Sequence, residues 1–201
     1  GNFTTGFTFM GWVKWDAFNM HALIFSMGDD VNNGVNTNLI SISGSGTQQA
    51  ISIRCSNNSM VLSSNIIPNQ WIHIAFTVNE NGYMTAFING TETYGINVSP
   101  IADVVRTSCF LGGADNDYYG KFNGAVDEVS IWSRALTITE VQNKMNSSLA
   151  GNENGLYAYY RFNQGSPEGL NTTCIKLLDA GVNTKDGALA DFTLSGSFSN
   201  W

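Results

Sequence analysis

Charged residues are scarce in this chain of 201 residues. Lys, Arg, Asp and Glu make up 12% of it, and 16 acidic against 9 basic residues give a net charge of −7. The basic residues are scattered and form no stripe that could follow a phosphate backbone, so we expect no nucleic-acid partner. The chain also lacks a run of 18 apolar residues, and we therefore expect no membrane insertion.

Cysteine is almost as rare, with Cys55, Cys109 and Cys174 as its three occurrences. Three cysteines allow at most one internal disulfide, and their spacing does not determine which two would pair. No Cys-x-x-Cys pair is present, which argues against a zinc site or a redox centre of that type.

Hydrophobic residues and glycine are abundant instead. Hydrophobic residues make up 43% of the chain and glycine occupies 21 positions, whereas proline occupies 3. About eleven β-type runs follow one another, separated by clusters of Gly, Asn, Asp and Ser, a pattern typical of sandwiches and barrels. We expect one domain over residues 1–201, because β-sandwiches of this length commonly fold as a single unit.

The clearest local predictions are one hairpin and one helix. Residues 71–90 form the hairpin, since apolar residues alternate from Ile72 to Val78 and an Asn-Gly step ends the connection at Gly82. The helix is expected over residues 137–146, where Thr137 and Glu140 have the spacing of a capping box. Its apolar face is formed by Ile138, Val141 and Met145.

Four stretches resemble a known family: FTFMGWVKW, QWIHIAFTVNENGYMTAFING, FLGGADN and FNGAVDEVSIWSRALTITEV. They look like the laminin-G-like (LamG type 3, pentraxin-related) domains of the concanavalin A-like lectin/glucanase superfamily. The resemblance covers nearly the whole chain and implies a jelly-roll β-sandwich of two antiparallel sheets with one short helix. The C-terminal part of the chain resembles the closing segment of such domains in large secreted bacterial proteins. This resemblance implies a secreted or cell-surface location.

Members of this family usually begin with a strand that this sequence lacks, since only six residues precede Phe7. We expect the tail strand around residues 187–196 to occupy that position beside the first strand. Leu189, Phe192 and Leu194 would then contribute to the core. Four larger aromatic residues are also expected in the core: Trp12, Trp71, Trp132 and Tyr157.

An acidic pair, Asp127 and Glu128, lies inside an otherwise buried strand, where a charge must be compensated. The resemblance implies that Asp127 helps to bind a structural calcium ion. Asp29 and Asp30 offer further carboxylate oxygens, which are the ligands that calcium prefers. The alternative is that Asp127 accepts hydrogen bonds from backbone N–H groups or from an arginine such as Arg134 or Arg161.

Carbohydrate binding is the function that we expect. A sugar site needs an aromatic surface for the apolar face of the ring and amides or carboxylates for the hydroxyl groups. One predicted loop offers both: Asp115, Asn116, Asp117, Tyr118 and Tyr119. We expect a non-catalytic extracellular carbohydrate-binding or adhesion module, whose partner is a glycan or a neighbouring extracellular protein domain. The alternative is a structural protein–protein module that serves as a spacer in a surface adhesin or extracellular filament.

Catalysis is not expected. Glucanases of this superfamily carry Glu-x-Asp-x-Glu on one strand, so that alternation directs two carboxylates to one face. Asp127 and Glu128 are adjacent, and a regular strand would direct them to opposite faces. The two histidines, His21 and His73, have no nearby Ser or Cys in a nucleophile motif.

Overall fold

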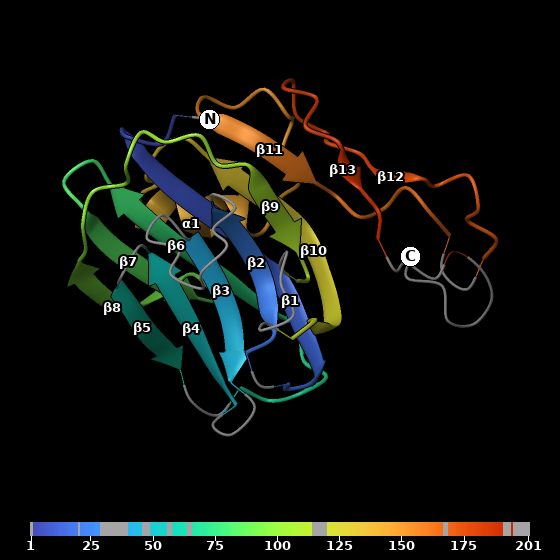
Figure 1. Cartoon of the computed structure of the whole chain (residues 1–201), viewed down its shortest axis with the longest axis horizontal. Helices are drawn as coiled ribbons and strands as arrows, with labels where there is room; N and C mark the ends of the chain where they lie inside the picture. The colour runs from blue at the N-terminus through green and yellow to red at the C-terminus, as the bar shows by residue number, and fades with distance from the viewer. Residues whose placement is uncertain are drawn as a thin grey trace.

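Two antiparallel β-sheets pack face to face and form a β-sandwich (Figure 1). The computed structural model describes residues 2–19, 21–28, 40–45, 49–55, 58–63, 66–113, 120–166, 169–190 and 194. Within these residues every regular element is a strand, apart from one short helix. The prediction of an all-β jelly-roll sandwich with one short helix is therefore confirmed. None of the described residues form a helix that is long and apolar enough to cross a membrane.

Strand β1 (Gly6–Ala17) lies inside the larger sheet. It pairs antiparallel with β10 (Asn123–Trp132) on one side and with β6 (Ile72–Asn79) on the other. The larger sheet has six strands in the order β11 (Leu156–Tyr160), β10 (Asn123–Trp132), β1 (Gly6–Ala17), β6 (Ile72–Asn79), β7 (Tyr83–Ile88) and β8 (Thr91–Asn97). The smaller sheet has five strands in the order β5 (Asn58–Ser63), β4 (Ala50–Cys55), β3 (Ile40–Ser45), β2 (Leu23–Gly28) and β9 (Ser108–Leu111).

Alternating side chains of the strands fill the space between the two sheets. Phe9 of β1 and Phe25 of β2 come from opposite sheets, and their ring centroids are 4.6 Å apart. Ile74, Phe76 and Val78 of β6 are buried in the same core, as their alternation predicted. Because neighbouring residues of a strand point to opposite sides, this core also determines which residues of the larger sheet point outward.

The predicted hairpin and helix are both present. β6 and β7 pair antiparallel, and Gly82 in their connection has a φ of +80°. Helix α1 (Ile138–Lys144) begins after Thr137, whose side chain and that of Glu140 form the predicted capping box. Val141 is buried as expected, whereas Ile138 is 42% exposed and lies away from the packed side of the helix.

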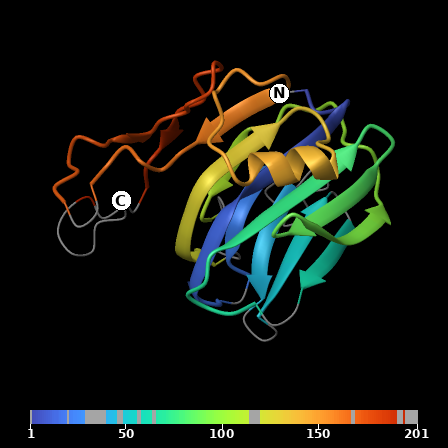
Figure 2. The same cartoon turned by 180° about the vertical axis from the view of Figure 1, so that it is seen from behind.

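Helix α1 lies on the outer face of the larger sheet (Figure 2). A second, smaller apolar cluster fills the space between them, separate from the core of the sandwich. We call it the outer cluster; its buried members are Met10, Ala75, Phe87, Trp132, Leu136, Val141, Leu156 and Tyr159.

The start of α1 is also held by an ion pair. The Arg134 guanidinium donates two hydrogen bonds to the Glu140 carboxylate, at 2.6 and 3.0 Å. These bonds and those from Thr137 lower the pKa of Glu140 from 4.5 to about 2. The folded pKa is thus lower than the unfolded one, so the stabilisation is complete above about pH 4.5 and is lost as the pH falls towards 2.

We expect Glu140→Gln to lower the free energy of unfolding at pH 7 by about 1–2 kcal/mol. This value is kept small because solvent screens the ion pair of Arg134 and Glu140, whose side chains are 30% and 32% exposed. The difference between the variant and the original chain should shrink towards zero between pH 4.5 and pH 2. Chemical denaturation at several pH values measures it, with Glu92→Gln on the exposed strand β8 as the control. A difference that does not change with pH would contradict the ion-pair explanation.

The prediction for the tail is wrong. Both sides of β1 are occupied by β10 and β6, so no position beside it is vacant. Residues 169–190, which we call the arm, extend past β11 instead, and strand β13 (Gly187–Ala188) pairs there with β12 (Lys176–Leu177) (Figure 1). Leu189 and Leu194 are half-buried and belong to neither cluster, while Phe192 lies outside the described residues.

Candidate functional site

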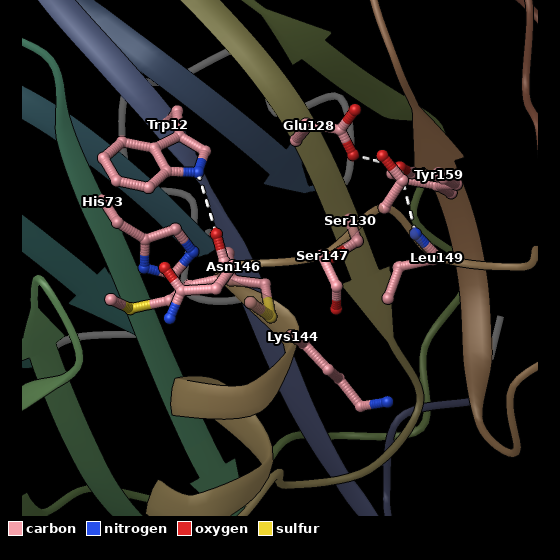
Figure 3. Close-up of a pocket in the computed structure, with 12 residues that line it drawn as sticks. Trp12, His73, Glu128, Ser130, Lys144, Asn146, Ser147, Leu149 and Tyr159 are labelled. Atoms are coloured by element: carbon pink, nitrogen blue, oxygen red, sulfur yellow. Dashed lines mark hydrogen bonds between the residues drawn. The ribbon is translucent and has the colours of Figure 1, made fainter.

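A pocket of about 340 Å³ opens on the outer face of the larger sheet, beside the end of α1 (Figure 3). One wall is formed by Lys144, the last residue of α1, and by residues 145–149 after it. The strands contribute Met10, Trp12, His73, Glu128, Ser130 and Tyr159. Figure 3 shows Trp12 and His73 towards one end of this outer-face pocket and Glu128 and Tyr159 towards the other.

An irregularity in β10 creates the acidic end of the pocket. Met10 of β1 pairs with Ser130, but Trp12 pairs with Asp127, so two residues of β10 stand opposite Gly11 alone. This is a β-bulge, and Glu128 within it has a φ of +49°. Few residues other than glycine adopt such a conformation, and when one does at a pocket the strain is often linked to function.

Gly11 leaves room for this bulge. A Cβ atom added to Gly11 would lie 3.0 Å from Cγ2 of Val129 and 3.2 Å from its Cα. These contacts are closer than normal van der Waals distances, so a larger residue would press on the bulge. The glycine within FTFMGWVKW therefore has a structural role that is evident only from the pairing of the strands.

The bulge corrects the prediction that Asp127 and Glu128 face opposite sides. Paired residues of an antiparallel ladder point to the same face, so Asp127 lies on the outer face with Trp12. Glu128 also lines the outer-face pocket, while Val129 after it is buried in the core. The prediction was wrong because the extra residue of a bulge interrupts the alternation.

Hydrogen bonds fix the position of the Glu128 side chain and of the pocket wall formed by the segment after α1. Tyr159 donates its phenol hydrogen to the Glu128 carboxylate, and the Leu149 N–H donates to the Tyr159 oxygen at 3.2 Å. Burial, followed by the bond to Glu128, raises the pKa of Tyr159 to about 12, so the phenol keeps its proton near neutral pH. Trp12 Nε1 donates to the Met145 carbonyl at 3.1 Å and fixes the other end of the same wall.

His73 is a buried polar group at the second end of the pocket. Its side chain is 1% exposed, and its ring packs edge-on against Trp12 with the centroids 5.4 Å apart. Burial lowers the pKa of His73 to about 4, so the ring is neutral near pH 7. Its Nδ1 atom is buried and has no hydrogen-bond partner in the described part of the chain. Buried polar atoms normally have partners, and this one is an exception.

Asp127 satisfies the hydrogen-bond alternative in part. Its Oδ1 accepts the Glu128 N–H at 2.8 Å, while Arg134 pairs with Glu140 instead. Burial raises the pKa of Asp127, with the Glu128 charge acting in the same direction and the backbone bond acting against it.

The other predicted calcium ligands, Asp29 and Asp30, lie outside the described residues. Among the residues that the structure describes, no group of three His, Cys, Asp or Glu is arranged to hold a metal ion. The calcium site stays a prediction.

The predicted sugar-binding loop, Asp115, Asn116, Asp117, Tyr118 and Tyr119, also lies outside the described residues, so this assignment stays a prediction. The expectation of four core aromatic residues is only partly correct. Trp132 is fully buried and Tyr157 packs against the core, but Trp12 lines the pocket and Trp71 is 45% exposed. Trp12 and Trp71 were misplaced because both belong to the outer face, which the short helix only partly covers.

Comparisons with known proteins agree with this architecture. Residues 1–142 match the family model of the concanavalin A-like lectin/glucanases superfamily, and the chain belongs to this superfamily. The resemblance inferred from the sequence is thereby confirmed. A search of curated proteins found no match.

Several solved structures share the fold. A candidate carbohydrate-binding protein from Bacteroides ovatus is 19% identical with a TM-score of 0.72, and the match covers 94% of this chain and 52% of that one. Domain 4 of AbnA, a GH43 extracellular arabinanase from Geobacillus stearothermophilus solved in complex with arabinotriose, is 25% identical with a TM-score of 0.54. That match covers 69% of this chain and 66% of the other. The CBM40 of a Ruminococcus gnavus IT-sialidase is 14% identical with a TM-score of 0.59, over 70% of this chain and 82% of the other. This chain thus spans about half the length of the B. ovatus protein.

Proposed function

We propose that this domain is a non-catalytic carbohydrate-binding module. The observation that carries the proposal is the make-up of the outer-face pocket, which places an indole ring, a carboxylate and an amide around one hollow. Trp12 offers the apolar surface, and Glu128 and Asn146 offer hydrogen-bonding groups for hydroxyls. Sugar sites combine such an apolar surface with a few polar groups of fixed orientation.

Two further observations support this function. The superfamily includes lectins by its description, and the arabinanase domain that shares the fold was solved with arabinotriose. By analogy, we place the domain outside the cell, with a glycan or a neighbouring extracellular protein domain as its partner. The loop of Asp115, Asn116, Asp117, Tyr118 and Tyr119 is proposed as a second contact region for the same glycan.

Calcium remains part of the proposal, with Asp127, Asp29 and Asp30 as its ligands. Binding to a glycan array, measured once with millimolar calcium and once with a chelator, tests it. Equal glycan binding and equal melting temperatures in both conditions would contradict a structural calcium ion, because an ion bound only to the folded state raises the melting temperature.

Trp12→Ala should weaken glycan binding about tenfold or more, because it removes the largest apolar surface of the pocket. Isothermal titration with the best glycan of the array measures the effect, and circular dichroism confirms that the variant is folded. Trp71→Ala is the matched control, because it removes an exposed indole that does not line the pocket. The affinity of this variant for the glycan should change less than twofold. A larger loss in Trp71→Ala than in Trp12→Ala would place the site elsewhere.

The same protein should release no reducing ends from the glycans that it binds. A pair of glycosidase carboxylates lies on either side of the scissile bond, whereas Asp127 and Glu128 are consecutive residues and Glu128 is held by Tyr159. Sustained hydrolysis that Glu128→Gln abolishes would show that the domain is an enzyme.

A second candidate function is the structural protein–protein module. The arm favours it, because Leu170, Ile175 and Val182 are 78%, 70% and 70% exposed. Apolar side chains gathered on one segment often mark contact with another protein, here a neighbouring domain. A protein that binds no glycan and associates through the arm would favour this function over carbohydrate binding.

A further inference from the structure

We propose that the outer-face pocket selects neutral sugars and rejects sugars that carry a carboxylate. The inference rests on the proposed carbohydrate-binding function and adds the chemical class of its ligand. It follows from the charges of the pocket, from the hydrogen bonds that its polar groups can still make, and from the fixed position of Glu128.

The charges at the pocket disfavour an anionic ligand. The Glu128 carboxylate lines the pocket, and Asp127 lies next to it on the same face. Among the described residues that line the pocket, Lys144 is the one Lys or Arg, and its ammonium group lies 4.9 Å from the centroid of the Trp132 ring. A carboxylate bound at the Glu128 end of the pocket would therefore meet like charges, while the ammonium group of Lys144 lies at the Trp132 ring.

The remaining hydrogen-bonding capacity suits hydroxyl groups. An ionised carboxylate only accepts hydrogen bonds, and Tyr159 supplies one donor to Glu128, which leaves other lone pairs for the ligand. His73 lines the other end of the pocket as a neutral ring, so it adds no positive charge that would attract a carboxylate. A hydroxyl group of the ligand can donate a hydrogen bond to Glu128. A ligand carboxylate could only accept, so it would add no hydrogen bond to the one that Glu128 receives from Tyr159.

The position of Glu128 is set before any ligand binds. The bulge holds its backbone at a φ of +49°, and the Asp127 carboxylate accepts its N–H group. Tyr159 orients the side chain and is itself held by the Leu149 N–H. A carboxylate fixed in this way discriminates strongly, because it cannot turn away from a like charge at little cost.

Matched pairs of neutral and acidic oligosaccharides with the same linkage test the inference, since members of each pair differ only in the oxidation of one carbon in each sugar residue. Galactose oligomers against galacturonic acid oligomers, and glucose oligomers against glucuronic acid oligomers, are suitable probes. The original chain should bind the neutral member of the better pair at least about tenfold more tightly, because like-charge contact costs more than the 1.4 kcal/mol of a tenfold ratio.

Glu128→Gln removes the charge and keeps the shape. We expect the neutral-to-acidic affinity ratio to fall about tenfold in this variant. Glu92→Gln, which removes a charge on the exposed strand β8, should leave the ratio unchanged. Tyr159→Phe keeps the packing of the ring and removes the bond that positions Glu128, so it should weaken binding of the neutral sugar and lower the neutral-to-acidic ratio by less than Glu128→Gln does.

Equal or tighter binding of the acidic sugar by the original chain would overturn the inference while leaving carbohydrate binding intact. An unchanged ratio in folded Glu128→Gln would overturn it as well. If that variant does not fold, the comparison of neutral and acidic sugars on the original chain decides alone. A chain that binds no sugar of either class would overturn both this inference and the proposed function.

Discussion

Replacing Trp132 with alanine should lower the free energy of unfolding by about 3–5 kcal/mol. Its indole is fully buried in the outer cluster, and its Nε1 donates to the Ser130 hydroxyl at 3.0 Å. The cationic groups of Arg134 and Lys144 lie 5.8 and 4.9 Å from its ring centroid. Removing the ring leaves a cavity between β10 and α1, so the wall of the outer-face pocket should loosen and glycan affinity should fall too.

Urea denaturation followed by far-ultraviolet circular dichroism measures this effect without depending on tryptophan fluorescence. Trp132→Phe fills most of the cavity and should cost less than the alanine variant. Trp71→Ala, at a position that is 45% exposed, should cost less than about 1 kcal/mol. Similar losses for Trp71→Ala and Trp132→Ala would mean that the outer cluster contributes little to stability.

Gly6→Ala should destabilise the fold by about 3 kcal/mol or more, since two separate costs add at this position. Gly6 begins β1 with a φ of +127°, a conformation that residues with a Cβ atom rarely adopt. An added Cβ would also lie 2.6 Å from the backbone nitrogen of Ala135 and 3.0 Å from the carbonyl oxygen of Val78. Both neighbours are backbone atoms, so β1 would have to move away from the segment that leads into α1.

The melting temperature and the urea midpoint of Gly6→Ala should both fall well below those of the original chain. Gly113→Ala introduces the same methyl group where no atom of the described residues, apart from its chain neighbours, lies within 4 Å, and it should change stability by less than about 0.5 kcal/mol. Equal stability of the two variants would contradict the close approach of β1 and residues 134–135.

The sequence by itself determined the features that depend on a few neighbouring residues. The alternation of Ile74, Phe76 and Val78 placed β6 correctly because a strand with one buried face must repeat every second residue. Thr137 and Glu140 located the start of α1 because the capping box closes within four residues. The family was also recognisable, since its motifs occur within single strands and turns.

Tertiary structure alone decided the features that depend on which strands become neighbours. The bulge that brings Glu128 into the pocket exists only through the pairing of β10 with β1. No residue within β10 predicts it from the sequence. Strand β8 is polar and largely exposed, so it lacks an alternating pattern and is formed by its pairing with β7. Trp12 and Trp71 carry the same side chain as Trp132, and only the position of the short helix leaves one of the three buried. The hydrophobic pattern of a strand determines which of its faces is apolar, whereas long-range packing determines what covers that face. The candidate site lies at the end of α1, where the helix no longer covers the outer face of the larger sheet.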